Sequence, residues 1–237
     1  MKSVLVIGCG WLGMPLAVAL QRKGYTVTGS TRQAERRAQL ESDGIRAISQ
    51  HEITEFYDAV VCTLTPPKTE ADHELHRSIA ASAAKLEIPQ LIYTSSTSIY
   101  PDTPQLMDEE KADRNSTMGQ LEELYRQEYK DVTILRLGGL YGGKRHPAFY
   151  LSGKKNVAKP MAVINLVSQE RVISAIELTV DKGIKGESFN IVDPEHPTRK
   201  NYYSDVCAQL GIPAPEFENT IDKGKVIDDS KWKLWFE

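Results

Sequence analysis

One glycine-rich hexapeptide near the N-terminus constrains the fold of this chain more than any other feature. It reads Gly8-Cys9-Gly10-Trp11-Leu12-Gly13 and lies between an apolar run, Ser3–Ile7, and a segment with helical patterning, Trp11–Lys23. In such a turn the first glycine permits the tight bend, the second lets the backbone approach a pyrophosphate, and the third lets helix and strand pack closely. The helix N-terminus then faces the phosphates. Because a second strand-like run, Tyr25–Ser30, follows at once, we expect a βαβ unit whose glycine turn binds a dinucleotide.

The same segment has a competing interpretation as a secretory signal. Lys2 precedes the uncharged stretch Val4–Leu20, and Ala17-Val18-Ala19 imitates a cleavage site. Three spaced glycines argue against it, as do three widely separated cysteines without a C-x-x-C pair. Such cysteines are typical of a reducing compartment. We therefore favour the dinucleotide turn and expect a cytoplasmic protein.

Strand-like and helix-like stretches alternate through the first 143 residues. The expected strands are Ser3–Ile7, Tyr25–Ser30, Ile45–Ser49, Asp58–Cys62, Gln90–Ser95 and Val132–Leu135. The expected helices are Trp11–Lys23, Gln33–Ser42, Glu70–Leu86 and Met118–Glu128. This alternation predicts an α/β fold of the Rossmann type, a doubly wound parallel sheet with helices on both faces.

The pattern loosens after Gly143. A strand over Ala162–Val167, a helix over Gln169–Val180, a strand over Glu187–Val192 and a helix capped by Thr198 are expected there. We therefore divide the chain into an NAD(P)-binding domain, residues 1–143, and a smaller α+β substrate lobe, residues 144–237, interwoven with it.

Composition narrows the partners. The chain has 237 residues and a net charge of −3, so nothing in its charge favours nucleic acid or an anionic membrane. No cluster of His or Cys has the spacing of metal ligands. A small-molecule substrate is expected, in a monomer or a homodimer.

The end of the second expected strand bears on the choice of cofactor. NAD-binding domains usually place Asp or Glu there to accept hydrogen bonds from the ribose hydroxyls. This chain has Ser30, Thr31 and Arg32 instead, with Arg36 and Arg37 one helical turn further on. A guanidinium can pair with a 2′-phosphate through two hydrogen bonds. The sequence therefore favours NADP(H) and leaves NAD(H) open.

Several later motifs resemble one enzyme family. Residues 93–100, Tyr-Thr-Ser-Ser-Thr-Ser-Ile-Tyr, resemble the strand end of extended short-chain dehydrogenases/reductases. Leu135-Arg136-Leu137, Leu140-Tyr141-Gly142 and Arg145-His146-Pro147 resemble that family's next stretch, and Phe189–Asp193 resembles a strand of its substrate lobe. The chain is most similar to the atypical YeeZ-like group, within the NAD-dependent epimerase/dehydratase family. Its glycine turn departs from the family's G-x-x-G-x-x-G pattern at Ile7.

The resemblance implies a catalytic serine or threonine at Ser96 and a Tyr/Lys pair four residues apart on the next helix. In that family the tyrosine moves the substrate proton and the lysine lowers its pKa. The matching positions hold Ser116 and Gln120, so the pair is missing. Tyr100, which follows the same strand end as Ser96, is the candidate replacement for the missing tyrosine. The alternative is that its ring only packs and fixes the loop.

Further candidates lie at the edges of the expected sheet. Thr65 and Pro66 follow the fourth strand and are expected beside the cofactor. In the loop after Gly143, Arg145 and His146, next to Lys144, are candidates for an anionic group of the substrate. The one Tyr-x-x-x-Lys pattern, Tyr150 to Lys154, lies outside the expected catalytic helix and is interpreted as packing.

Two functions fit these features. The first is an NADP(H)-dependent oxidoreductase or epimerase, with rearranged acid and base groups, acting on a small sugar- or carbonyl-bearing substrate. The second is a dinucleotide-binding sensor or scaffold without turnover. The sequence leaves open whether the chain is an enzyme.

Overall fold

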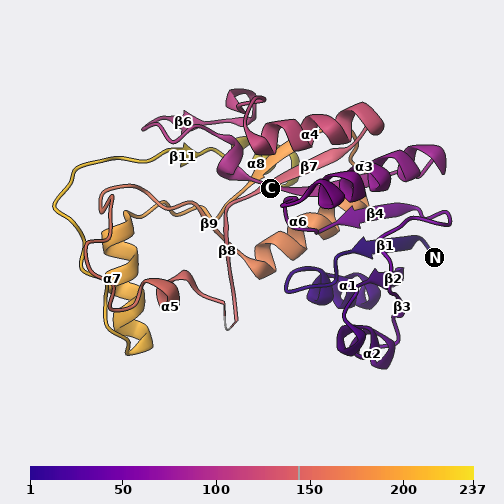
Figure 1. Cartoon of the computed structure of the whole chain (residues 1–237), viewed down its shortest axis with the longest axis horizontal. Coiled ribbons are helices and arrows are strands. Elements are labelled where there is room, and N and C mark those ends of the chain that lie inside the picture. The colour runs from indigo at the N-terminus through magenta and orange to yellow at the C-terminus, as the bar shows by residue number, and fades with distance from the viewer. Residues whose placement is uncertain (144) are drawn as a thin grey trace. The chain divides into compact units, whose positions relative to one another are not determined.

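Seven parallel strands form the central sheet, in the order β10-β7-β5-β4-β1-β2-β3. Figure 1 shows this computed structural model, which describes residues 1–143 and 145–237. The strands are β1 Ser3–Ile7, β2 Thr26–Ser30, β3 Arg46–Ile48, β4 Ala59–Cys62, β5 Leu91–Ser96, β7 Thr133–Leu137 and β10 Ser188–Ile191. The α/β Rossmann-type fold expected from the sequence is confirmed.

The strand order reverses direction between β1 and β4. Ile7 at the end of β1 lies level with Ser30 in β2 and with Cys62 in β4, so the carboxyl ends of these strands share one edge. In open parallel sheets, ligands bind in the crevice outside such an edge at the point of reversal. The topology therefore directs attention to the loops that follow β1, β2, β4 and β5.

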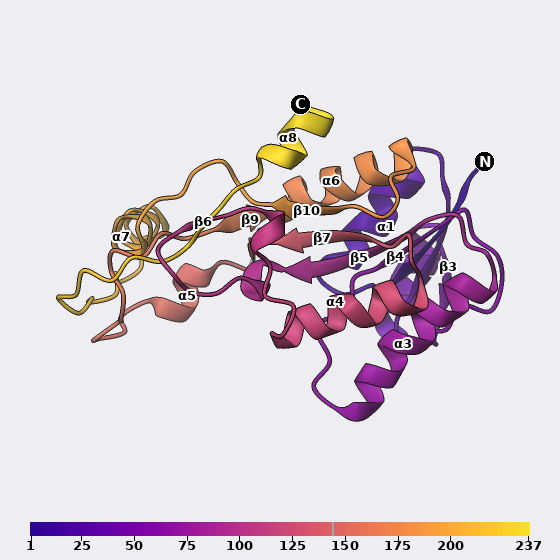
Figure 2. The same cartoon turned by 90° about the horizontal axis from the view of Figure 1, so that it is seen from above.

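Helices cover both faces of the sheet. Figure 2 shows α1 and α6 on one side and α3 and α4 on the other. Their bounds are α1 Gly13–Arg22, α3 Glu70–Lys85, α4 Thr117–Glu128 and α6 Gln169–Lys182, while α2 Ala34–Ser42 contacts β2 and β3. Residues 4–7 of β1 and 59–62 of β4 are buried throughout, because layers on both sides exclude water from them.

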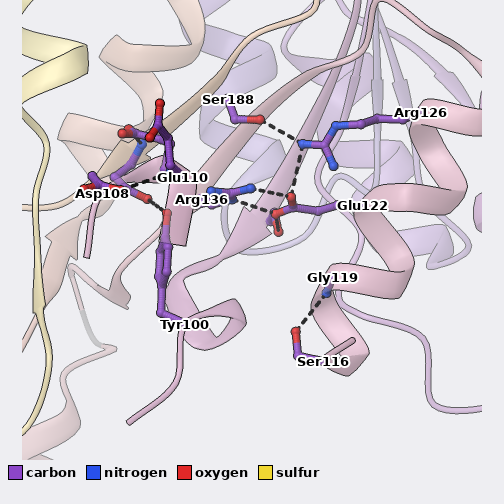
Figure 3. Close-up of polar contacts among 12 residues, drawn as sticks. Tyr100, Asp108, Glu110, Ser116, Gly119, Glu122, Arg126, Arg136 and Ser188 are labelled. Atoms are coloured by element: carbon purple, nitrogen blue, oxygen red, sulfur yellow. Dashed lines mark hydrogen bonds and ion pairs between the residues drawn. The ribbon is translucent and has the colours of Figure 1, made fainter. Parts of the chain in front are cut away.

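A buried ion pair attaches α4 to the sheet. Glu122 is 0% exposed, and its carboxylate accepts two hydrogen bonds from the guanidinium of Arg136 on β7, at 3.0 and 2.8 Å. Ser95 Oγ on β5 donates to the same carboxylate at 2.7 Å. Arg126 also donates to this carboxylate, at 3.3 Å, and to Ser188 Oγ (Figure 3). One carboxylate thus connects α4 with β5 and β7.

The chain divides into two compact units. The first contains Met1–Ser96, Arg114–Arg136 and Ile173–Phe189, and the second contains Thr97–Asp113, Leu137–Val172 and Asn190–Glu237. The second unit has two small parallel sheets, β6–β11 and β8–β9. Its elements are β6 Leu106–Met107, β8 Gly139–Tyr141, α5 Pro147–Leu151, β9 Leu166–Ser168, α7 Arg199–Leu210, β11 Val226–Ile227 and α8 Ser230–Phe236.

Packing of α5 against α7 supplies a core for the second unit, built around Ala148, Ile164, Tyr203 and Cys207. The cap expected at Thr198 is confirmed, since its hydroxyl accepts from Asn201 N.

The strand expected over Ala162–Val167 is wrong in its bounds. Only its last two residues belong to β9, which runs from Leu166 to Ser168. Before them the backbone makes irregular contacts: Ile164 N donates to the carbonyl of Pro197, and Gly139 N donates to the carbonyl of Asn165. Apolar residues such as Ile164 pack into the core of the unit there and do not form a strand.

Among the described residues, no helix combines the length and the apolarity needed to cross a membrane.

The Glu122 network yields a stability prediction. We expect Glu122→Ala to lower the free energy of unfolding by about 3–5 kcal/mol, because it leaves the buried Arg136 guanidinium without its counter-charge. Urea unfolding followed by circular dichroism measures the loss. Glu123→Ala, on the neighbouring and partly exposed position, is the matched control and should change stability by no more than about 0.5 kcal/mol. Equal losses in both variants would contradict the anchoring role.

Candidate functional site

The glycine turn has the geometry that its sequence predicts. Gly8 has a φ of +91°, which L side chains rarely adopt. A Cβ added at Gly13 would lie 2.5 Å from Gly8 O and 2.8 Å from Thr63 Oγ1, so only glycine lets the start of α1 approach the turn this closely. Leu12 is buried beneath the turn and Trp11 is half-buried. The first and third glycines are therefore required by the fold itself.

Gly10 differs from the other two glycines because open space lies above it. A Cβ there would meet only Arg36 Nη1 at 3.5 Å and Gly8 O at 3.8 Å, which are ordinary contacts. This glycine is not needed for packing. Its open face and the nearby guanidinium of Arg36 are what a pyrophosphate requires, namely close backbone approach and a positive charge.

Thr63, which the sequence analysis did not single out, ties β4 to the turn. Its amide donates to Ile7 O at 2.9 Å, and its hydroxyl lies 3.1 Å from Ile7 O and 2.9 Å from Gly8 O. A polar residue directly after an all-apolar strand was the available signal. The next residues along this loop, Thr65 and Pro66, are exposed at the same edge of the sheet.

The carbonyl of Thr65 is held from behind by a buried polar chain. His76 Nε2 donates to Thr65 O at 3.2 Å, and His76 Nδ1 lies 2.8 Å from the Tyr125 hydroxyl. That hydroxyl is 3.3 Å from Cys62 Sγ, and the Tyr125 ring stacks on Tyr93 with centroids 4.3 Å apart. Burial lowers the pKa of His76 and raises the pKa values of Cys62 and Tyr125, so these three side chains stay uncharged. The hydrogen bond from His76 thereby fixes the loop after β4, at the sheet edge where the cofactor is expected.

The end of β2 carries polar and cationic groups but no carboxylate. Ser30 and Thr31 are buried, Arg32 is exposed, and the carbonyl of Ser30 accepts hydrogen bonds from the amides of Gly8 and Cys9 in the glycine turn. The predicted ribose-binding residues are thereby joined to the predicted pyrophosphate-binding residues. Burial raises the pKa of Cys9 to about 12, so its thiol stays protonated beside the turn.

The arginines near this strand end have different partners. Arg37 Nη1 donates to the carbonyls of Thr31 and Arg32, at 3.1 and 2.8 Å, and so braces the loop. Arg36 lies beside Gly10. His51, which follows β3, shares a hydrogen bond through Nδ1 with Ser30 Oγ and was not foreseen from the sequence.

Ser96 ends β5 at the same edge and is partly exposed. At the start of α4, the two positions where the sequence resemblance implied a Tyr/Lys pair, Ser116 and Gln120, have local structural contacts. Ser116 caps the helix by accepting from Gly119 N at 3.0 Å (Figure 3), and Gln120 donates to the carbonyl of Asn115 at 3.1 Å. A helix cap and an exposed amide carry no charge and cannot replace a phenol and an ammonium.

In the second unit, Tyr100 is 2% exposed and donates to Asn190 Oδ1 at 2.6 Å. Asn190 in turn donates to Asp228 O at 2.8 Å, and Lys225 Nζ donates to Tyr100 O at 2.7 Å. These bonds fix the ring and its hydroxyl in one place. The catalytic role assigned to Tyr100 stays a prediction.

Of the basic loop in the second unit, Lys144 lies outside the described residues, and Arg145 is exposed. His146 caps α5: its Nδ1 accepts from Ala148 N at 3.1 Å, and its Nε2 lies 3.0 Å from the Tyr202 hydroxyl. Burial lowers the pKa of His146, which favours the neutral ring. The Lys154 ammonium lies over the exposed Tyr150 ring, 3.3 Å from its centroid. Among residues 1–143 and 145–237, no three His, Cys, Asp or Glu side chains gather as metal ligands would.

Comparison with known proteins identifies the family. Protein YeeZ of Escherichia coli K12 is 35% identical over 264 aligned residues, which cover 98% of this chain and 93% of that protein. The chain belongs to the YeeZ family. In this YeeZ family member, residues 3–119 also match the NAD binding domain of 6-phosphogluconate dehydrogenase. Binding of a pyridine nucleotide by the glycine-turn unit is thus supported by a match that spans β1 to the start of α4.

Solved structures share the fold of this YeeZ family member at low sequence identity. A functionally unknown conserved protein from Silicibacter pomeroyi matches with a TM-score of 0.78 at 19% identity, covering 99% of this chain and 92% of its own. UDP-glucuronic acid 4-epimerase from Bacillus cereus, solved with NAD, matches with a TM-score of 0.77 at 18% identity, covering 98% and 89%. Both likenesses concern the fold.

The contrast between Gly10 and Gly13 yields a prediction about binding. Gly10→Ala should fold with nearly unchanged stability but lose at least tenfold in dinucleotide affinity, because its Cβ enters the space left for the pyrophosphate. Gly13→Ala should instead lose about 1–3 kcal/mol of stability, because its Cβ overlaps Gly8 O. Calorimetric titration and thermal unfolding of both variants separate the effects. Unchanged cofactor affinity in Gly10→Ala would place the pyrophosphate elsewhere.

Proposed function

We propose that this YeeZ family member is an NADP(H)-dependent oxidoreductase or epimerase that acts on a small sugar- or carbonyl-bearing substrate without the usual Tyr/Lys pair. The observation that carries the proposal is the continuous polar edge formed by the glycine turn, the end of β2, Thr63 and Ser96. The glycine turn offers a site for the pyrophosphate, the end of β2 offers cations beside the ribose, and Ser96 offers a hydroxyl at the end of β5. Solved proteins of the same fold include epimerases of nucleotide sugars.

The preference for NADP(H) rests on charge. A 2′-phosphate carries close to two negative charges at neutral pH, and it requires cations where NAD-binding domains place a carboxylate. Arg32 and Arg36 supply them, while Arg37 holds the loop backbone. Ser30 and Thr31 are small enough to leave room for the phosphate.

For catalysis, we assign Ser96 to hydrogen-bond the substrate oxygen on which charge develops. Tyr100 is the first phenol that follows Ser96 in sequence, and its hydroxyl would have to exchange Asn190 for the substrate. Arg145 and His146 are assigned to an anionic group of the substrate. Burial disfavours the charged form of His146, so Arg145 would carry the fixed charge.

A non-catalytic sensor or scaffold is the second candidate, and a specific observation favours it. Ser116 and Gln120 make ordinary helix contacts, and α4 is held to the sheet by Glu122 instead. The position of α4 against the sheet therefore depends on Glu122 and requires no acid or base group in the first turn of the helix. Under this proposal the chain binds the cofactor and transmits its presence without turnover.

Cofactor titration tests the NADP(H) assignment. NADPH should bind at least tenfold more tightly than NADH, and Arg32→Ala and Arg36→Ala should each weaken NADPH more than NADH, because only NADPH carries the 2′-phosphate. Isothermal calorimetry measures both affinities, with Trp11 fluorescence as a second signal. Arg22→Ala, at the C-terminal end of α1, is the matched control and should leave both unchanged. Tighter binding of NADH by the wild type would overturn the assignment.

A search for turnover tests the enzyme proposal. If nucleotide sugars, aldehydes or ketones react with NADPH, Ser96→Ala and Tyr100→Phe should each lower kcat at least tenfold with cofactor affinity unchanged. Tyr93→Phe is the matched control, because it removes a buried hydroxyl that has no hydrogen-bond partner among residues 1–143 and 145–237. Full activity in Tyr100→Phe would assign that ring to packing. Tight NADPH binding without any turnover would favour the sensor.

A further inference from the structure

His51 is a buried polar side chain in the largely exposed stretch that follows β3. It is 8% exposed, while its neighbours Gln50 and Glu52 are exposed. Its Nδ1 shares a hydrogen bond with Ser30 Oγ, which is completely buried at the carboxyl end of β2. A buried imidazole needs such a partner, because burial of an unpaired polar group is costly. The imidazole thus lies against the strand end at which NAD-binding domains place the carboxylate that reads the adenosine ribose.

The charged surroundings of His51 are cationic. Arg32, from the loop between β2 and α2, is the charged group whose field acts on the imidazole. Arg32 also acts on Asp72 at the start of α3, and Arg36 from α2 lies beside Gly10. Burial first and Arg32 second lower the pKa of His51, so the free protein holds it neutral near pH 7.

We infer that His51 is a further specificity-determining residue of the cofactor site: held by Ser30, it takes up a proton when a 2′-phosphate binds at the end of β2. This rests on the proposed preference for NADP(H). A phosphate dianion within reach of the imidazole reverses the local field and stabilises the imidazolium. NADH has a hydroxyl at that position and offers no such compensation. His51 thereby adds a positive charge only when the ligand carries the matching negative one.

Proton uptake by His51 determines how the preference for NADPH changes with pH. A group that binds a proton in the complex but not in the free protein weakens binding as pH rises. The ratio of NADPH affinity to NADH affinity should therefore fall at least about fivefold between pH 6 and pH 8, against a limit of tenfold per pH unit for one proton. Ionisation of the 2′-phosphate itself, with a second pKa near ~6, acts in the opposite direction. The two sources of pH dependence are therefore distinguishable by sign.

His51→Asn is the decisive variant, because its side-chain amide can occupy the place of Nδ1, keep the bond to Ser30 and not titrate. Calorimetric titrations with NADPH and NADH at pH 6, 7 and 8, repeated in buffers of different ionisation enthalpy, give affinities and protons taken up. The wild type should take up protons with NADPH, and its affinity ratio should fall with pH. In His51→Asn the uptake should vanish and the ratio should stay flat or rise.

The matched control is His73→Gln, which removes an imidazole from α3 and should behave as the wild type. Ser30→Ala tests the positioning of the ring, and we expect it to lose at least half of the pH-dependent change. A wild type that prefers NADPH with the same pH course as His51→Asn would overturn the role of His51 and leave the proposed function intact. A wild type that binds NADH more tightly at every pH would overturn the proposed NADP(H) preference itself.

Discussion

The close approach of Gly13 to the carbonyl of Gly8 is the contact on which the rest of the cofactor edge depends. It brings the N-terminus of α1 over the end of β1, and Thr63 then bonds both Ile7 O and Gly8 O from β4. From the other side, the amides of Gly8 and Cys9 donate to Ser30 O on β2. Three strand ends are thus fixed to one turn. The groups expected to hold pyrophosphate and ribose are positioned by backbone bonds, which any side chain at Gly8 or Gly13 would break.

Helix α4 is attached to the sheet from its middle and not from its first turn. The carboxylate of Glu122, in the middle of the helix, bonds Arg136 and Ser95 and carries the attachment to the sheet. The first turn is stabilised separately by the Ser116 cap. This attachment runs through Glu122, six residues after Ser116 and two after Gln120, and not through the side chains at those two positions, so they can change without displacing the helix. A fold shared with epimerases is therefore compatible with enzymatic and non-enzymatic descendants.

Local patterns predicted much of the first unit, because its elements are specified by residues close in sequence. The bounds of β1 were predicted residue for residue, and the Thr198 cap expected for the last long helix is present at the start of α7. The short strands of the second unit escaped prediction. Leu106 in β6 pairs with Val226 in β11, 120 positions along the chain, and two-residue strands carry no periodicity.

The same distinction explains what was missed at the site. The spacing of its glycines predicts the glycine turn. His51 and Ser30, in contrast, are 21 residues apart and meet only because β2 and β3 pair in parallel. Nothing in the sequence near Glu122 indicates that this carboxylate is buried. Its burial follows from Arg136, which the sequence presented as one residue of a family motif. Contacts between groups distant in sequence were accessible only through the fold.

The sequence placed Arg32 at the end of the second expected strand and Arg36 and Arg37 one helical turn further on, and their contacts in the structure differ. Arg37 is committed to two backbone carbonyls. The field of Arg32 acts only weakly on Asp72, because that carboxylate accepts hydrogen bonds from the amides of Lys68 and Thr69, and these lower its pKa more than Arg32 does. Asp72 therefore loses little when Arg32 turns away. An arginine whose counter-ion is satisfied by other donors is available to a ligand at small cost, which is the property that recognition of a 2′-phosphate at the end of β2 requires.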